Sequence, residues 1–131
     1  MTGTRQTHSS GAPWEPVVGY SRALRVGSHV YVSGTAAIGR NGEVVGGDDP
    51  AAQMRHCLQI VSEALRALGA ELRDVVRTRM YVTDMRHWEA IGRVHGEWFG
   101  TVRPATTMVQ VAALIEPDLL VEVEAEAIIQ S

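Results

Sequence analysis

The sequence predicts a single α+β domain in which a mixed β-sheet carries two helices on one face. The chain has 131 residues, which is long enough for one hydrophobic core but not for two. Two segments show apolar residues at helical spacing, and strand-like segments flank both of them. The expected order is β-β-β-α-β-α-β-β. Strands that come first and then alternate with helices are typical of an α+β domain with its helices on one sheet face.

The first half of the chain is expected to begin as a β-meander. Strands are predicted at residues 17–26 and 29–33. The dipeptide Asn41-Gly42 lies between two further short strands, at residues 36–40 and 43–45. It suits a type I′ hairpin turn, because both central residues of that turn need a positive φ.

The first helix has clear start and stop signals. Asp48 or Asp49 can cap its N-terminus, Pro50 suits the first helical position, and Gly69 suits the residue after the end. One apolar stripe predicts that this helix packs on a sheet. The stripe consists of Met54, Leu58, Val61, Leu65 and Leu68.

The second half of the chain alternates strands with one more helix. We expect a strand at residues 74–82, a helix at 85–99 capped by Asp84, and strands at 103–111 and 120–127. Several strands are apolar on both sides, while the helices can cover only one face of the sheet. The other face is therefore expected to pack against another subunit.

Composition limits the class of protein. The net charge is −3, which argues against a nucleic-acid partner, and no apolar run approaches the length of a membrane span. All twelve basic residues are arginine, which excludes Schiff-base catalysis and a Walker-type phosphate loop. The single cysteine, Cys57, is interpreted as a core residue. Histidine spacing does not indicate a metal site.

The N-terminus carries no signal-peptide pattern. Residues 1–13 are expected to be a flexible tail, ahead of a domain at residues 14–131. A cytoplasmic location follows as an expectation.

Six short strings resemble the Rid family, the YjgF-like reactive-intermediate deaminases that are also described as the endoribonuclease L-PSP type. Their shared order and spacing make the resemblance specific, and it extends over about residues 19–129. The strings are Gly19-Tyr20-Ser21-Arg22-Ala23, Val32-Ser33-Gly34, Asn41-Gly42-Glu43-Val44-Val45, Ala51-Ala52-Gln53 with Leu58, Pro104-Ala105 and Glu122-Val123-Glu124-Ala125.

The resemblance implies a chorismate-mutase-like fold and a homotrimer whose sheets form a central barrel. It also implies small-molecule clefts between the subunits. Active members of the family hydrolyse small enamines and imines, such as 2-aminoacrylate, to ketoacids and ammonia without a metal or an organic cofactor. In such a site an arginine holds the substrate carboxylate and a glutamate positions the attacking water.

The resemblance also assigns residues of this chain to the site. Thr106 occupies the place of the arginine, and a hydroxyl cannot supply charge or a bidentate fork. Losing a charge-assisted bond costs about 1.5–3 kcal/mol, or roughly tenfold to a hundredfold in binding. Arg22 and Arg103 are the candidates to replace it. The binding residues assigned by position are Tyr20, Ser33, Gly34, Thr106 and Met108, and the catalytic residue is Glu122.

Two functions follow as hypotheses. The first is a homotrimer that hydrolyses an enamine or imine with water positioned by Glu122. The second is a non-catalytic protein that binds or senses a small molecule. A structural role is also open for the row Glu122, Glu124 and Glu126, which share one strand face and could pair with Arg77 and Arg79.

Overall fold

The structure, a computed structural model, describes residues 4–130 and is built around a six-stranded mixed sheet. The strands lie in the order β1-β2-β3-β6-β4-β5. Every neighbouring pair is antiparallel except β4 and β5, which are parallel. The strands are β1 (Arg5–His8), β2 (Ala23–Val26), β3 (His29–Ala36), β4 (Val75–Val82), β5 (Ala105–Gln110) and β6 (Val121–Ile128).

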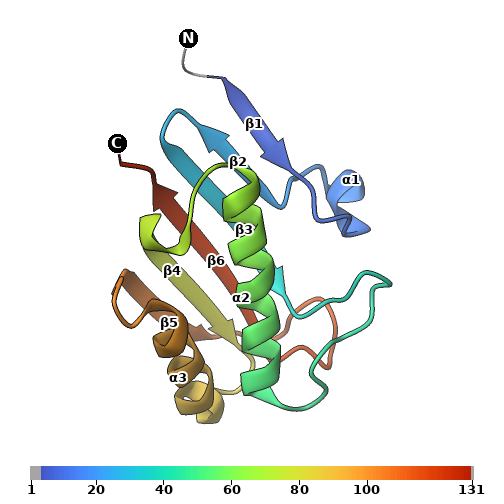
Figure 1. Cartoon of the computed structure of the whole chain (residues 1–131). Helices are drawn as coiled ribbons and strands as arrows, with labels where there is room; N and C mark the ends of the chain where they lie inside the picture. The colour runs from blue at the N-terminus through green and yellow to red at the C-terminus, as the bar shows by residue number, and fades with distance from the viewer. Residues whose placement is uncertain (1–3, 131) are drawn as a thin grey trace.

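Two long helices lie side by side on one face of this sheet (Figure 1). They are α2 (Pro50–Ala67) and α3 (Trp88–Phe99), and a short helix, α1 (Trp14–Val18), lies beside the β1–β2 edge. This arrangement confirms the predicted fold class, a single α+β domain with two helices on one face. In residues 4–130, no helix combines the length and apolar character needed to cross a membrane.

The signals at the ends of α2 act as the sequence predicts. The Asp49 side chain accepts hydrogen bonds from the backbone N–H groups of Ala51 and Ala52, and Pro50 occupies the first turn. Gly69, just after the helix, has a φ of +86°. Glycine adopts this left-handed conformation without the steric cost that a Cβ would add.

The hydrophobic core lies between the two long helices and the sheet. The stripe of α2 is buried, as predicted, together with Cys57. Alternation along β6 turns Val121, Val123 and Ala125 into this core and leaves the glutamates on the opposite face. The sheet therefore has one dry face and one face that carries charged residues.

Gln53 is a fully buried polar residue that links α2 to the start of β6. Its amide nitrogen donates to the carbonyls of Gly47 (2.7 Å) and Asp118 (2.9 Å), and its oxygen accepts from Leu120 N–H (2.8 Å). All three partners are backbone groups of residues that lie outside the helices and strands. The Gln53 side chain therefore joins two loops to α2.

We expect Gln53→Leu to lower the free energy of unfolding by about 3 kcal/mol, because it leaves three backbone groups without a partner. Urea denaturation measures the change. Gln59→Leu, an exposed position on the same helix, is the control and should cost less than about 0.5 kcal/mol. Equal losses of unfolding free energy in the two variants would show that the hydrogen bonds of the Gln53 amide do not cause the destabilisation.

Two expectations for the N-terminal region are wrong. Part of the expected tail forms β1, which pairs with β2 from Arg5↔Val26 to His8↔Ala23; residues 1–3 lie outside the described residues. Residues 14–18 form α1, so the strand expected at residues 17–26 begins only at Ala23. Gly19 ends α1 with a φ of +89°, and this helix stop has no place in a continuous strand.

The expected hairpin around Asn41-Gly42 is met only in part. The chain reverses there, with an antiparallel bridge between Ile38 and Val44 and a hydrogen bond from Gly39 N–H to the Glu43 carbonyl (2.7 Å). The two short strands expected beside the turn do not form, because β3 already ends at Ala36. Gly42 has a positive φ, but Asn41 does not, so the turn is not type I′. The six strands of the predicted order are nevertheless present, because β1 supplies one of the first three, while α1 is a helix that the predicted order lacks.

Candidate functional site

A cavity of about 900 Å³ brings together four of the six residues that the resemblance assigns to the site. We call it the Glu122 cavity. Its walls come from residues 8–12, α1, the end of β3, the following loop and one side of α2. The four assigned residues that line it are Tyr20, Ser33, Gly34 and Glu122.

A β-bulge in β3 places two of these residues. Val32 pairs with Ala125 and Thr35 pairs with Val123, so three steps along β3 correspond to two steps along β6. The extra residue falls at Ser33-Gly34. Bulges bend a strand and redirect side chains, and they are common beside active sites.

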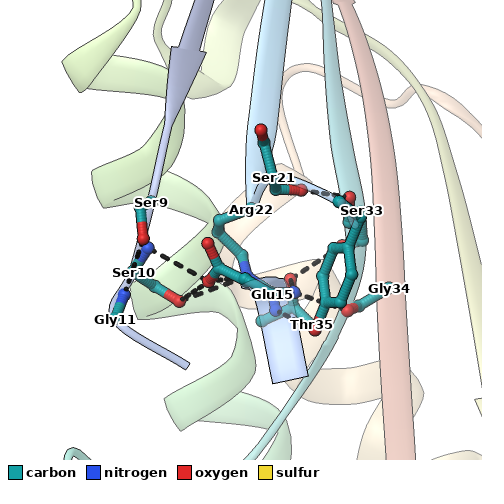
Figure 2. Close-up of polar contacts among 10 residues, drawn as sticks. Ser9, Ser10, Gly11, Glu15, Ser21, Arg22, Ser33, Gly34 and Thr35 are labelled. Atoms are coloured by element: carbon teal, nitrogen blue, oxygen red, sulfur yellow. Dashed lines mark hydrogen bonds and ion pairs between the residues drawn. The ribbon is translucent and has the colours of Figure 1, made fainter. Parts of the chain in front are cut away.

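Arg22 holds this bulge from the neighbouring chain segment, as Figure 2 shows. Its Nη1 donates to the Gly34 carbonyl (2.6 Å) and to Thr35 Oγ1 (3.1 Å). Its Nη2 donates to the Tyr20 hydroxyl (3.1 Å), and its Nε donates to Ser10 Oγ (3.4 Å). The side chain is buried, so these bonds fix the shape of the cavity wall.

Glu15 supplies the negative charge nearest to this buried arginine. Its carboxylate lies 3.8 Å from Arg22 Nε and accepts two hydrogen bonds from Ser10, one from the hydroxyl and one from the backbone N–H (Figure 2). Burial by itself raises the pKa of Glu15. The hydrogen bonds from Ser10 and Ser9, together with the charge of Arg22, nevertheless hold that pKa below its ordinary value. Through Glu15, α1 thus fixes the position of Arg22 in the cavity wall.

Glu122 is the one glutamate of its row without a partner. Tyr81 donates to the Glu124 carboxylate, and Arg79 lies 3.5 Å from Glu124 and 3.1 Å from Glu126. Within residues 4–130, the Glu122 carboxylate has neither a hydrogen bond nor an ion pair. The structural role expected for these three glutamates, pairing with arginine, is therefore found for Glu124 and Glu126 but not for Glu122.

The environment of Glu122 shifts its titration. Partial burial raises the pKa of this carboxyl above its ordinary value of 4.5; the charge of Arg22 opposes the shift and that of Glu124 adds to it. A carboxylate with a raised pKa is a better proton acceptor near neutral pH than an exposed one. Glu122 is thus chemically suited to act as a general base.

Gly34 leaves the space that Glu122 occupies. A Cβ at Gly34 would lie 2.1 Å from Glu122 Oε2, which is too close for two non-bonded atoms. The clash is with the end of a flexible side chain and not with the backbone. The carboxylate would therefore move while the strands stay in place.

We expect Gly34→Ala to cost only about 1 kcal/mol of stability. If Glu122 positions the attacking water, as the resemblance implies, the variant should also lower hydrolysis about a hundredfold, because it displaces this carboxylate. Thermal unfolding and steady-state kinetics measure the two effects. Gly92→Ala, where no atom lies within 4 Å of the added methyl group, is the control and should leave activity unchanged. A stable Gly34→Ala protein with full activity would contradict this assignment.

Thr106 and Met108 lie outside the Glu122 cavity of their own chain. Thr106 Oγ1 is 2.8 Å from Thr78 Oγ1 and 3.5 Å from His95 Nε2, on the face of the sheet that α3 covers. Glu122 projects from the opposite face of β6, two strands away. One chain alone therefore does not bring Thr106 and Glu122 together.

The two arginines weighed as substitutes differ in position. Arg103 is exposed, lies before β5 and does not line the cavity. Its φ is +53°, and among residues 4–130 it is the only non-glycine residue with a positive φ. Arg22 does line the cavity, but four of its N–H groups are already engaged. Neither Arg22 nor Arg103 of the same chain therefore presents two free N–H groups to the cavity.

Sequence reasoning missed Ser10, Glu15 and Thr35 as supports of the site. The available signal was Gly19, which marks a helix end and therefore a short helix that could carry Glu15. Cys57 is buried as predicted, and burial first, then the charge of Glu122, raises the pKa of its thiol. Within residues 4–130, no three His, Cys, Asp or Glu side chains are grouped as metal ligands.

The chain is similar to a family model, to a bacterial protein and to solved structures. The family model described as Endoribonuclease L-PSP matches residues 10–129. The Streptomyces coelicolor protein SCO2049 is 39% identical over 119 residues, which is 90% of this chain and 87% of that protein. These similarities span the whole domain and not a single motif.

Two crystal structures extend the comparison. Rv2704 from Mycobacterium tuberculosis, described as a member of the YjgF/YER057c/UK114 family, is 50% identical with a TM-score of 0.88. That alignment covers 96% of this chain and 100% of Rv2704. YyfA from Yersinia pestis, described as a Rid protein, is 25% identical with a TM-score of 0.83, over 96% of this chain and 100% of YyfA.

Proposed function

Because this chain belongs to the Endoribonuclease L-PSP family, known also as YjgF or Rid, we propose that it binds a small metabolite in the Glu122 cavity. We propose further that it hydrolyses an enamine or imine there. The observation that carries the proposal is the Glu122 carboxylate. It is partly buried, has no partner within residues 4–130, and lies beside a bulge whose glycine leaves it room.

The chemistry needs only water and one carboxylate. Glu122 accepts a proton from water while the water oxygen bonds to the imine carbon, and the π electrons of the C=N bond move to nitrogen. Glu122 returns this proton to nitrogen, which gives a carbinolamine. Glu122 then carries the remaining proton of the added water from the hydroxyl to nitrogen, and the C–N bond breaks as the C=O bond forms. The products are a carbonyl compound and ammonia, and the unpaired oxygens of Glu122 suit each of these proton transfers.

Tyr20 and the bulge would orient the substrate. The Tyr20 hydroxyl accepts a hydrogen bond from Arg22, so its own proton is available to the cavity. The Ser33 hydroxyl donates to the Ser21 carbonyl, which fixes the entry of the bulge. These groups give the cavity a rigid polar wall that needs no reorganisation when the substrate binds.

A homotrimer would complete the site. The β5 edge strand is exposed, and apolar side chains, among them Tyr31, are exposed elsewhere on the sheet. In the assembly that the resemblance implies, a neighbouring subunit would bring Thr106 and Met108 to the Glu122 cavity. Light scattering tests the assembly, and a monomer at micromolar concentration would contradict it.

The direct test of the reaction is ammonia release from freshly generated imines by the purified protein. We expect hydrolysis above the buffer rate for at least one compound in a set that runs from 2-aminoacrylate to bulkier imines. No acceleration for any compound would favour the alternative, a protein that binds or senses a small molecule without turning it over. The Thr106 position favours that alternative, because the resemblance places a carboxylate-binding arginine there.

The pH dependence of the reaction should follow the ionisation of Glu122. A general base acts only when deprotonated, so kcat/KM should rise with pH through the raised pKa of this carboxyl. We expect the midpoint of the acid limb to lie above 4.5, the ordinary value for glutamate. Rates corrected for the buffer reaction measure it. An acid limb at or below 4.5 would mean that another group controls the rate.

A further inference from the structure

The charges of the Glu122 cavity are unbalanced toward the negative side. Three glutamates line it, Glu63, Glu122 and Glu124, against the two arginines Arg22 and Arg40. Arg22 lies within 4 Å of the Glu15 carboxylate, which is also buried. Tyr81 and Arg79 hold Glu124, but Glu122 has no partner among the described residues.

Arg22 cannot hold a carboxylate with a bidentate fork without breaking the bulge. A guanidinium has five N–H groups, and four of those of Arg22 are donated to the bulge, to Tyr20 and to Ser10. One N–H remains, on Nη2. A single donor suits a neutral acceptor, whereas recognition of a carboxylate typically uses two parallel N–H groups.

Arg40 is the second arginine of the cavity lining and, unlike Arg22, is not buried. It is exposed, on the loop that follows β3. The rest of the wall includes apolar side chains: Trp14, Val18, Ile60 and Ile115. Val18 and Ile115 are 70% and 57% exposed, so they present apolar surface to an incoming molecule.

From these contacts we infer that the substrates of this cavity are imines or enamines without a carboxylate at the reacting carbon, carrying instead an apolar substituent. The inference rests on the proposed function and deepens it. The nitrogen end, neutral or protonated, meets the unpaired Glu122 carboxylate. The apolar substituent contacts apolar residues of the wall, such as Trp14 and Ile60. A carboxylate beside the reacting carbon would instead lie close to the Glu122 carboxylate, which repels it, and the buried Arg22 has no fork left to hold it.

Two imines that differ only in a carboxylate provide the test. An amine oxidase generates one from 2-phenylethylamine, and an amino-acid oxidase generates the other from phenylalanine. We expect kcat/KM for ammonia release to favour the imine without the carboxylate by at least about tenfold. A preference for the imine with the carboxylate would overturn the inference. Loss of that preference in Arg40→Ala or Arg103→Ala would then identify the arginine responsible, in this chain or in a neighbouring one.

A binding measurement separates this inference from the proposed reaction. The stable compounds 2-phenylethylamine and phenylpyruvate are titrated into the protein, and binding is followed by tryptophan fluorescence. Tighter binding of the amine, weakened in Glu122→Gln, supports the ligand class even if neither imine is hydrolysed; in that case the proposed reaction fails and the inference stands. Equal or tighter binding of phenylpyruvate would overturn the inference whatever the rates are.

Discussion

Glu122→Gln should abolish hydrolysis while leaving the protein folded and at least as stable as the wild type. The amide keeps the size of the side chain but cannot accept a proton from water. A loss of about 10²- to 10⁴-fold in kcat is expected, which is the usual contribution of a general base. KM should also rise, because the amide no longer offers a negative charge to the nitrogen end of the substrate, although the shape of the cavity is preserved.

The stability side of this prediction follows from the raised pKa of Glu122. The folded protein holds the carboxyl proton more tightly than the unfolded chain does. Ionisation therefore costs stability as pH rises from 4.5 through the raised pKa. The glutamine variant lacks this loss and should match or exceed the wild type at pH 7. Lower activity combined with equal or higher stability is the signature of a residue kept for function.

Glu126→Gln is the matched control for Glu122→Gln. It lies on the same face of β6 and pairs with Arg79, and it does not line the Glu122 cavity. We expect near-normal kcat in this variant. If Glu126→Gln lost as much activity as Glu122→Gln, the negative field of the row and not a specific base would be responsible.

Arg22→Met should destabilise the protein by about 3–5 kcal/mol, because it breaks a buried ion pair. The change leaves the Glu15 carboxylate buried without its counter-charge and removes the donors to Gly34 and Thr35. Equilibrium denaturation in urea measures the loss. The acid limb of the rate profile should also move to higher pH, since the charge of Arg22 lowers the pKa of Glu122.

Two further variants keep this prediction testable if Arg22→Met folds poorly. Arg73→Met removes an arginine whose side chain is 78% exposed, and it should change stability by less than about 1 kcal/mol. Adding Glu15→Gln to Arg22→Met should recover part of the lost stability, because the unpaired buried charge is then gone. An Arg22→Met protein as stable as Arg73→Met would contradict the role of Arg22 in holding the bulge.

Local signals predicted the helical half of the fold because they act over a few residues. The cap at Asp49, the proline at position 50 and the stop at Gly69 each act within one turn of α2. β1 could not be predicted in the same way. Its four residues are polar and mostly exposed, and only pairing with β2 makes them a strand.

The candidate site, like the fold, could be predicted from the sequence only in part. Glu122 stands out in the sequence only as one of three alternating glutamates, and its lack of a partner depends on which side chains β4 presents to β6. The role of Arg22 depends on a bulge in β3, and this bulge arises only where β3 pairs with β6, a strand that is distant in sequence. The alternating pattern predicted the face of Glu122 correctly. The difference between Glu122 and its neighbours required the paired strands.

The most direct test of the account is to titrate Glu122 itself and compare it with the rate. Carbon NMR of protein labelled at the glutamate carboxyl carbons, with Glu122→Gln to assign the resonance, gives the pKa of this group. We expect a value above 4.5 that coincides with the acid limb of kcat/KM. A Glu122 resonance that titrates at 4.5 or below, or a rate that does not change across its titration, would contradict the claim that Glu122 is the catalytic base.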